Sequence, residues 1–495
     1  VFRGLLVESL LLSATGAAIG VGIGRIALRA FSAYMPAGTL PAEAIAALDG
    51  RALAFTALLA VVTGLLAGTV PAWHGARDNV SGALRSTGRS VSGSRASARL
   101  HGGLLVTEIA LAMILVTGAA LLVASFVRLT RVSPGFDATD VLTLRLSLPE
   151  TRYRSAQAVA DFYGRVTATL QALPRVADAA AITSLPLGGW LYGATFSVEG
   201  EPVDPARPPA AHVQHATPGY FGTLGIPLAA GRAFTTRDDA RAPLVAVINE
   251  TFARRFIPAG DAVGRVVRMD EFNLQGEDDA RWRIVGVIRD VKTYGLDDAE
   301  LATPEIYIPV AQSPTPSLFV TVRSDGSPAT ALVPDVRAAI RTLDPELPIA
   351  DLQTMTDRVG GSVTSERFRT ALVGGFAALA ALLACLGVYA VRSQAVVARR
   401  REIGIRVALG AKPGDVLAMV LGQSARLVVA GLGLGLAGAL AMTRVLDRWL
   451  FATDARDPWM LAGAMAALGL AAIAASWVPA RRAAAVDPLT VLRDA

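Results

Sequence analysis

The sequence predicts an α-helical integral membrane protein with one large mixed α/β domain outside the membrane. Of its 495 residues, 53% are hydrophobic and only 18% are charged, and the mean hydropathy is +0.46. This composition excludes a disordered chain and disfavours an ordinary soluble enzyme. The apolar residues also cluster in six stretches of membrane-spanning length. A long segment between the third and fourth stretches has instead the periodicity of a water-exposed domain.

Each of the six expected spans is long enough to cross a bilayer, which takes about 20 apolar residues. They cover residues 5–28, 53–73, 103–127, 370–391, 416–442 and 458–478. An intramembrane charge is by default a functional candidate. We single out Glu108 in the third span and Arg426 in the fifth. For Glu108, extension of the carboxylate to the membrane surface and a contact between helices both stay open.

Arginine and lysine set the expected orientation, because they accumulate in cytoplasmic loops. One set of connections, with the C-terminal tail, holds Arg77, Arg85, Arg89, Arg95, Arg99, Arg392, Arg399, Arg400, Arg401, Arg406, Lys412, Arg481, Arg482 and Arg493. The opposite set holds Arg29, Arg51, Arg444, Arg448 and Arg456. We therefore expect the C-terminus to be cytoplasmic and residues 128–369 to lie outside.

The outside segment alternates between strand and helix patterns. Residues 141–148 place Leu142, Leu144, Leu146 and Leu148 on one face, and residues 156–173 have helical spacing. A second helix is expected at 329–343, and further strands at 176–182, 244–248, 283–288, 305–308, 318–322 and near 349. This order predicts a βαβ-type layer built from both ends of the segment. A β-rich insertion is expected near residues 217–312, after a proline-rich linker at 202–209.

Glycines at helical spacing predict close packing of membrane helices. The run Gly433-Leu-Gly435-Leu-Ala-Gly438 matches a dinucleotide fingerprint literally, but it lies inside a span and no strand precedes it. Small residues on one helix face let two membrane helices approach. We assign this packing role to Gly16, Gly20 and Gly24 in the first span and to Gly431 and Gly435 in the fifth.

Residues for catalysis or cofactor binding were not found. Neither lysine follows a glycine, so the chain has no Walker phosphate-binding loop. His212 and His215 have a spacing compatible with metal binding but no third ligand, which favours a surface histidine pair. The single cysteine, Cys385, excludes an internal disulfide and a zinc–cysteine cluster. The net charge of +6 follows the hydrophobic segments and does not favour nucleic-acid binding.

The two ends of the chain repeat each other. Residues 71–85 align with 479–493, and Gly16 and Gly20 align with Gly431 and Gly435. A duplicated two-span unit indicates a transporter built from repeated halves. The first copy lacks the outside domain and two spans that precede the second. We therefore expect the chain to be part of a longer protein.

The segment 399–411 is the most informative cytoplasmic stretch. Its sequence is Arg-Arg-Arg-Glu-Ile-Gly-Ile-Arg-Val-Ala-Leu-Gly-Ala, followed by Pro413. Ile403, Val407 and the region of Leu409 form an apolar stripe that arginines flank. A short amphipathic helix of this kind would lie on the membrane or dock into a partner's groove. A simple positive flank of a membrane span is the alternative.

Several segments of the chain resemble a known protein family. The segment Arg400–Ala411 resembles the cytoplasmic coupling segment of FtsX/MacB-type ABC transporter permeases, and Pro479–Ala484 with Asp487-Pro488 resembles their C-terminal signature. Five motifs resemble the MacB-like periplasmic domain: Pro218-Gly219-Tyr220-Phe221, Leu224–Pro227 with Gly231-Arg232, Val247–Glu250, Ile284–Val287 and Glu305–Pro309. The duplicated layout resembles permeases that fuse two such units. The first copy departs from the signature at Trp73-His74-Gly75, where the second has Arg481-Arg482-Ala483.

The resemblance implies a domain order. Residues 1–73 would be the last two spans of a first permease unit, 74–102 a cytoplasmic linker, and 103–127 the first span of a second unit. Residues 128–369 would be the extracytoplasmic domain. Residues 370–495 would supply three spans and a coupling helix near 399–412 in the inner membrane of a bacterium.

The resemblance also implies the function. A separate ATP-binding subunit, which uses ATP and Mg²⁺, would dock on Arg400, Arg401, Glu402, Gly404, Arg406, Leu409 and Gly410. The chain itself would bind no cofactor or metal and would not be an enzyme. Its expected partners are this ATPase, membrane lipid and an adaptor or cell-wall protein outside, but no nucleic acid. Export is the leading function, and a non-transporting permease that switches a periplasmic or cell-wall partner is the alternative.

Overall fold

The computed structural model describes residues 2–34, 49–77, 92–189, 192–202, 206, 208–257, 260–269, 273–276, 279–296, 303–409, 411–446 and 450–484. The chain divides into two compact units. One consists of Val1–Val123 with Phe368–Ala495, and the other is Ala124–Arg367. The first unit is helical, whereas the second contains all the described strands.

The helical unit is formed by α1 (Phe2–Tyr34), α2 (Gly50–Arg77), α4 (Ser92–Leu129), α10 (Thr364–Ala398), α11 (Arg400–Ala408), α12 (Pro413–Leu446) and α13 (Pro458–Ala484). Within the described residues, five helices are long and apolar enough to cross a membrane: Leu6–Arg29, His101–Leu129, Thr364–Val397, Pro413–Thr443 and Pro458–Ala484. The sixth expected span lies in α2, whose described apolar part, Gly50–Leu65, is shorter. Five of the six expected spans therefore coincide with helices that are long and apolar enough to cross a membrane, as a multi-pass membrane protein requires.

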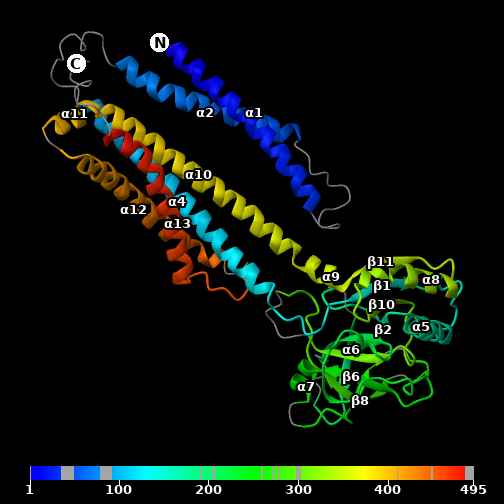
Figure 1. The fold of residues 1–495 in the computed structure, drawn as a ribbon. Coiled ribbons are helices and arrows are strands. Elements are labelled where there is room, and N and C mark those ends of the chain that lie inside the picture. Colours follow the sequence, from blue (N-terminus) through cyan, green and yellow to red (C-terminus); the bar gives the residue numbers. More distant parts are fainter. Residues whose placement is uncertain are drawn as a thin grey trace. The chain divides into compact units, whose positions relative to one another are not determined.

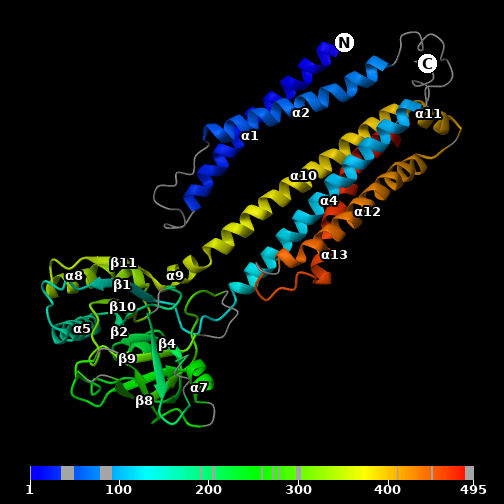
Figure 2. The same ribbon diagram turned by 180° about the vertical axis from the view of Figure 1, so that it is seen from behind.

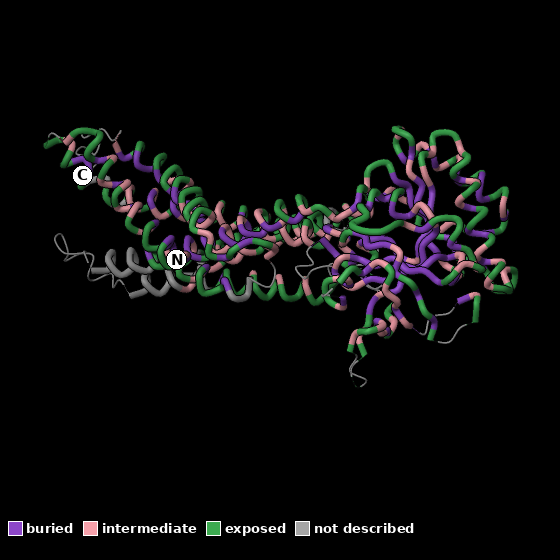
Figure 3. Tube along the Cα trace, turned by 90° about the horizontal axis from the view of Figure 1, so that it is seen from below, coloured by how far each residue is buried: buried purple, intermediate pink, exposed green. Residues whose placement is uncertain are grey.

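Helices α4, α10, α12 and α13 run side by side in both ribbon views (Figures 1 and 2). Their shared core combines Leu105, Ile109 and Met113 of α4 with apolar residues of the other three helices. Figure 3 shows buried residues in stripes along these helices and in the interior of the second unit. Many other apolar side chains on the four helices are exposed, as is typical of helices that face lipid.

The second unit starts from a four-stranded layer. Its strands are β1 (Val141–Ser147), β2 (Val176–Ile182), β10 (Ser317–Ser324) and β11 (Ile349–Thr354), in the spatial order β11-β1-β10-β2. Helix α5 (Ala156–Gln171) connects β1 to β2. The short η1 (Ala329–Leu332) and α8 (Val333–Leu343) connect β10 to β11. Every neighbouring pair is antiparallel, so this is two interlaced split βαβ units.

The alternation in β1 explains why one face of this layer is covered. Leu142, Leu144 and Leu146 share a buried core with Phe162 of α5 and Ile340 of α8. Both helices are amphipathic, so each buries one apolar face against the sheet. The βαβ-type layer from both ends of the segment is thus confirmed, because β1 and β11 come from opposite ends.

The insertion between β2 and β10 closes into a barrel. It contains β3 (Tyr192–Val198), β4 (Ala210–Ala216), β6 (Val245–Asn249), β7 (Val266–Met269), β8 (Ala280–Ile288) and β9 (Glu305–Pro309). The pairing order is β4-β3-β7-β8-β6-β9, and β9 pairs with β4 again. The short β5 (Leu228–Gly231) adds to β8 outside this ring. The interior of the barrel is filled by a hydrophobic core that includes Phe196, Ile248, Trp282 and Ile306.

This barrel corrects two expectations. The β-rich insertion begins with β3 at Tyr192 and not near residue 217, because β3 and β4 are barrel strands. The expected proline-rich linker at 202–209 lies within the insertion, between β3 and β4, and lies partly outside the described residues. The remaining short helices are α6 (Tyr220–Thr223), α7 (Glu250–Phe256) and α9 (Met355–Ser362).

Candidate functional site

Helix α11 lies at one end of the bundle, between the end of α10 and the start of α12 (Figure 1). Its N-terminal residue follows α10 after a single turn residue, and Leu409 at its C-cap donates its backbone N–H to Ile405. The following Ala411 donates its N–H to the carbonyl of Arg406. The helix therefore ends before Pro413, as the sequence predicts.

One face of α11 is anchored on the bundle. Ile403 is buried with Val416 and Val420 of α12 and with Ala480 and Ala483 of α13. Gly404 is also buried, and Val407 packs against the same cluster. This face connects the segment to two membrane helices at once.

The other face is open. Leu409 is 82% exposed and Ile405 is 43% exposed. Glu402 and Arg406, one turn apart, form an ion pair of 2.7 Å on the exposed side, and Arg406 also contacts Sδ of Met419 at 2.7 Å. An exposed apolar surface with charged residues beside it is typical of an interaction site.

The predicted docking residues separate accordingly. Glu402, Arg406 and Leu409 lie on the open face, whereas Gly404 lies on the buried one. Arg400 and Arg401 are in the first turn of α11, and their side chains lie outside the described part of the chain, as does Gly410. Leu409 does not join the apolar stripe of Ile403 and Val407, because it faces solvent.

The intramembrane candidates occupy different surroundings. Glu108 of α4 is half-buried, and its carboxylate lies so close to Gly387 of α10 that a side chain at Gly387 would overlap it. The glutamate thus contacts a neighbouring helix. Arg426 lies on an exposed face of α12. No ion pair links the two residues within the described residues.

The glycines proposed for helix packing also differ. A Cβ at Gly431 would lie 2.7 Å from Cβ of Ile109, and one at Gly435 would lie 2.5 Å from Cβ of Met113, so α12 approaches α4 closely at both. Gly16, Gly20 and Gly24 of α1 have no atom of another described residue within 4 Å of such a Cβ. Gly64 of α2 contacts α1 instead, near Ser13. Packing of the α1 glycines stays a prediction.

The two histidines lie in separate surroundings. They are three residues apart on β4, so they point to opposite faces of the strand. His212 Nε2 lies 2.9 Å from the hydroxyl of Tyr294. His215 is buried between Thr183 and Ser313, 3.1 Å from each hydroxyl, so the expected surface position is wrong for this residue. Among the described residues, no group of three metal-ligating side chains comes together.

The motifs of the second unit converge on one another and maintain its fold. Tyr220 stacks on Tyr307, with ring centroids 6.5 Å apart. Asn249 Oδ1 accepts hydrogen bonds from the backbone N–H groups of Phe252 and Glu305, each at 3.0 Å, so it caps α7 and fixes β9. The Glu305 carboxylate accepts hydrogen bonds from Thr293, at 2.7 Å, and from Tyr307.

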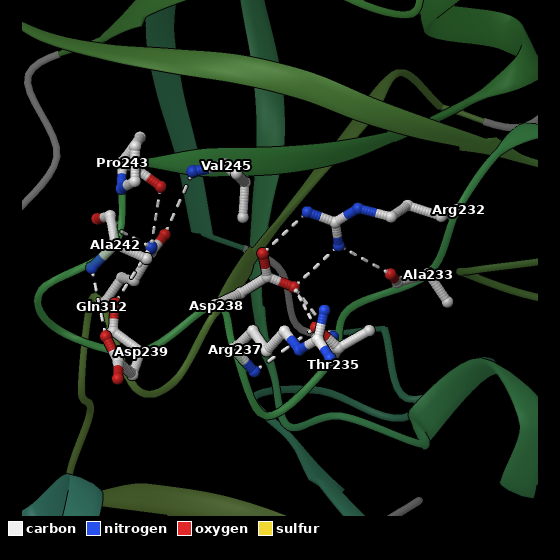
Figure 4. Close-up of polar contacts among 10 residues, drawn as sticks. All are labelled: Arg232, Ala233, Thr235, Arg237, Asp238, Asp239, Ala242, Pro243, Val245 and Gln312. Atoms are coloured by element: carbon white, nitrogen blue, oxygen red, sulfur yellow. Dashed lines mark hydrogen bonds and ion pairs between the residues drawn. The ribbon is translucent and has the colours of Figure 1, made fainter.

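A loop after β5 is held by a charged pair (Figure 4). Arg232 donates to both carboxylate oxygens of Asp238 at 2.8 Å, and Thr235 donates its N–H to the same carboxylate. Burial alone would raise the pKa of Asp238, but these hydrogen bonds outweigh burial and hold the pKa below its usual range.

Gln312 holds the other end of this loop (Figure 4). Its side chain accepts a hydrogen bond from the N–H of Val245 and donates to the carbonyls of Asp239, Ala242 and Pro243.

The comparisons with known proteins agree with this architecture. Residues 109–342 match the MacB-like periplasmic core domain, and residues 374–488 match the FtsX-like permease C-terminal domain. Together these matches define a membrane permease component of an ABC transporter. The chain belongs to the MacB/FtsX-type permeases of this class.

Named relatives cover different shares of the chain. The chain is 27% identical over 377 residues to the macrolide export ATP-binding/permease protein MacB of Azoarcus sp. (strain BH72), and the match covers 72% of this chain and 51% of that protein. It is 26% identical over 274 residues to the pyoverdine export ATP-binding/permease protein PvdT of Pseudomonas aeruginosa, and the match covers 54% of this chain and 40% of that protein. The chain is also 26% identical over 301 residues to the uncharacterized ABC transporter permease YknZ of Bacillus subtilis (strain 168). This match covers 57% of this chain and 70% of that protein. The chain thus spans about half or less of the MacB and PvdT relatives.

Proposed function

We propose that this chain is the permease subunit of an exporter and that a separate ATP-binding subunit docks on the open face of α11. The observation that carries the proposal is the two-sided helix. Ile403 is buried against α12 and α13, while Leu409 and Ile405 are exposed beside the Glu402–Arg406 pair. A partner that contacts the open face would move α12 and α13 through the buried face.

Two relatives support export, because their names describe a macrolide export protein and a pyoverdine export protein. We propose that the second unit lies outside the inner membrane and that ATP-driven movement of the helices reaches it through α4 and α10. We further propose that the chain crosses the membrane six times, with α2 as the second span and a cytoplasmic C-terminus. Residues 103–495 would then form one complete permease unit, and residues 1–73 the end of another.

The docking proposal is tested on the full-length protein with its ATPase in proteoliposomes. Replacing Arg400, Arg401 and Arg406 together, or Leu409→Asp with Ile405→Asp, should abolish the stimulation of ATP hydrolysis and the co-purification of the ATPase. Arg456→Glu changes an exposed arginine outside α11, so it is the control and should retain both. Unchanged stimulation in the α11 variants would refute the docking role.

The direction of function is tested separately. Mass spectrometry of proteins that co-purify from the native membrane should identify an outer-membrane channel or an adaptor if the chain exports. A stoichiometric cell-wall hydrolase in their place would support the switching function instead.

A further inference from the structure

A small cavity lies between α10, α11 and α12, on the bundle side of α11. Its volume is about 20 Å³, which is room for one water-sized atom. Residues of all three helices line it, among them Arg392, Arg399, Ile403 and Gln423. The cavity is partly open to the outside of the bundle.

Arg392 is the unusual member of this lining. It is only 6% exposed, and it donates one hydrogen bond, from Nη2 to the backbone carbonyl of Gln423, at 2.8 Å. Its buried Nε has no hydrogen-bond partner among the described residues. A guanidinium stays charged in proteins, so its charge has to be compensated where it is buried.

Among the described residues that line the cavity, a second arginine adds positive charge to that of Arg392. Arg399 lies two turns further along the chain and donates to Oε1 of the same Gln423, at 3.3 Å. The described lining residues include no aspartate or glutamate. The two acidic side chains nearest in sequence have other partners, because Glu402 pairs with Arg406 and Asp415 accepts from the N–H of Lys412.

We propose that this cavity is a phosphate-binding site, in which one oxygen of an anionic phospholipid headgroup sits between Arg392 and Arg399. Guanidinium groups bind phosphate through charge-assisted hydrogen bonds, and basic pockets between membrane helices bind lipid phosphates. Arg392 lies five residues before the end of the apolar stretch Thr364–Val397, which is roughly 8 Å along a helix. That stretch has 34 residues, roughly 51 Å of helix against a hydrocarbon core of about 30 Å, so its last two turns reach the headgroup region.

The site has a consequence for α11. Ile403 lines the same cavity and is the residue that anchors α11 on the bundle. An occupied site would hold α10, α11 and α12 together at the arginine-rich end. The assignment rests on the cavity and the two arginines and does not require that an ATPase docks on α11.

The test uses the full-length protein in detergent and in nanodiscs. Native mass spectrometry would count the phosphatidylglycerol and phosphatidylcholine molecules that it retains, and thermal unfolding would be followed with added phosphatidylglycerol, inorganic phosphate or chloride. The variants are Arg392→Gln and the exposed Arg399→Gln, so that a folding defect in the first leaves the second informative. Arg481→Gln removes the same charge from the end of α13 and is the control.

We expect the wild type and Arg481→Gln to retain phosphatidylglycerol selectively. Losing a charge-assisted hydrogen bond should weaken retention roughly ten-fold in Arg399→Gln. Stabilisation by inorganic phosphate that competes with the lipid would assign the same site to free phosphate as well. Equal retention by all variants, no lipid selectivity in the wild type, or equal stabilisation by chloride would each overturn the phosphate assignment. Because none of these measurements uses the ATPase, their failure is distinguishable from failure of the docking proposal.

Discussion

Gly231 and Gly286 face each other across the β5–β8 ladder, and neither has room for a side chain. A Cβ at Gly231 would overlap the carbonyl oxygen of Val285, and one at Gly286 would overlap that of Arg232. Gly231 also has φ of +73°, which favours glycine. Two motifs that lie more than 50 residues apart in the chain therefore carry glycine for a single reason, which is close contact of two strands.

Replacing Gly286 should destabilise the second unit. We expect Gly286→Ala to lower the free energy of unfolding by about 3 kcal/mol, because the methyl group meets backbone that cannot move aside. Denaturation of the full chain in detergent measures the change. Gly164→Ala is the control, since Gly164 lies on the exposed face of α5 with open space around it, and it should be neutral or slightly stabilising. Equal stability of Gly286→Ala and the wild type would contradict the contact.

The free energy of unfolding of the second unit should depend on pH through the titration of Glu305. Burial raises the pKa of Glu305 from 4.5 to about 7, although hydrogen bonds from Tyr307 and Thr293 act in the opposite direction. The unfolded chain ionises Glu305 above about pH 4.5, whereas the folded chain keeps it protonated until about pH 7. Its contribution to stability is therefore complete below pH 4.5, falls by about 1.4 kcal/mol per pH unit in between, and is constant above pH 7.

The measurement compares denaturation midpoints across this pH range. Glu305→Gln should remove the slope that Glu305 causes, because the amide does not titrate. Glu346→Gln changes a glutamate that is 77% exposed and should keep the wild-type slope. A wild-type slope that persists in Glu305→Gln would assign the pH dependence to another group.

Close packing of α12 on α4 makes Gly435 sensitive to size. We expect Gly435→Val to separate the two helices and to destabilise the bundle by about 2 kcal/mol or more, because its Cβ would lie 2.5 Å from that of Met113. Gly433→Ala changes the same helix where there is nothing within 4 Å, and it should be tolerated. Thermal unfolding in detergent distinguishes the two variants, and identical melting temperatures would argue against close packing at Gly435.

The membrane topology is accessible because Cys385 is the single cysteine. In a Cys385→Ser background, an impermeant maleimide should label Asp325→Cys and Asp49→Cys in intact cells. Ser97→Cys and Lys412→Cys should react only after permeabilisation. The position of residue 97 decides whether α2 crosses the membrane, since labelling like that of Asp49→Cys would remove the sixth span.

Local patterns predicted those elements whose cause is local. The alternation of Leu142, Leu144 and Leu146 predicted β1, and the spacing of apolar residues predicted α5, because burial of one face specifies each. Barrel closure was not predicted, because the pairing of His212 with Glu305 joins positions about 90 residues apart that share no local signal. Every residue of the four-residue strand β5 is on the exposed side, so the strand has no alternation of buried and exposed residues to reveal it.

The helical end shows the same division. The apolar run at Ile403 predicted α11, whereas Arg392 was interpreted only as a basic residue beside a membrane span. Its burial and its contact with Gln423 depend on how α12 lies against α10. The apolar residues Ala395–Val397 that follow Arg392 are the signal that would have placed it inside the apolar segment.

The attachment of the second unit to the membrane helices determines how it responds to a pulling force. Helix α4 leads into β1, and β11 leads through α9 into α10. The first residue pair of the β1–β11 ladder, Leu142 with Thr354, lies at the end where both connections are made. A force that separates α4 from α10 would load this one pair first and unzip the ladder pair by pair, which requires little force. A displacement shared by both helices would instead leave this ladder unloaded.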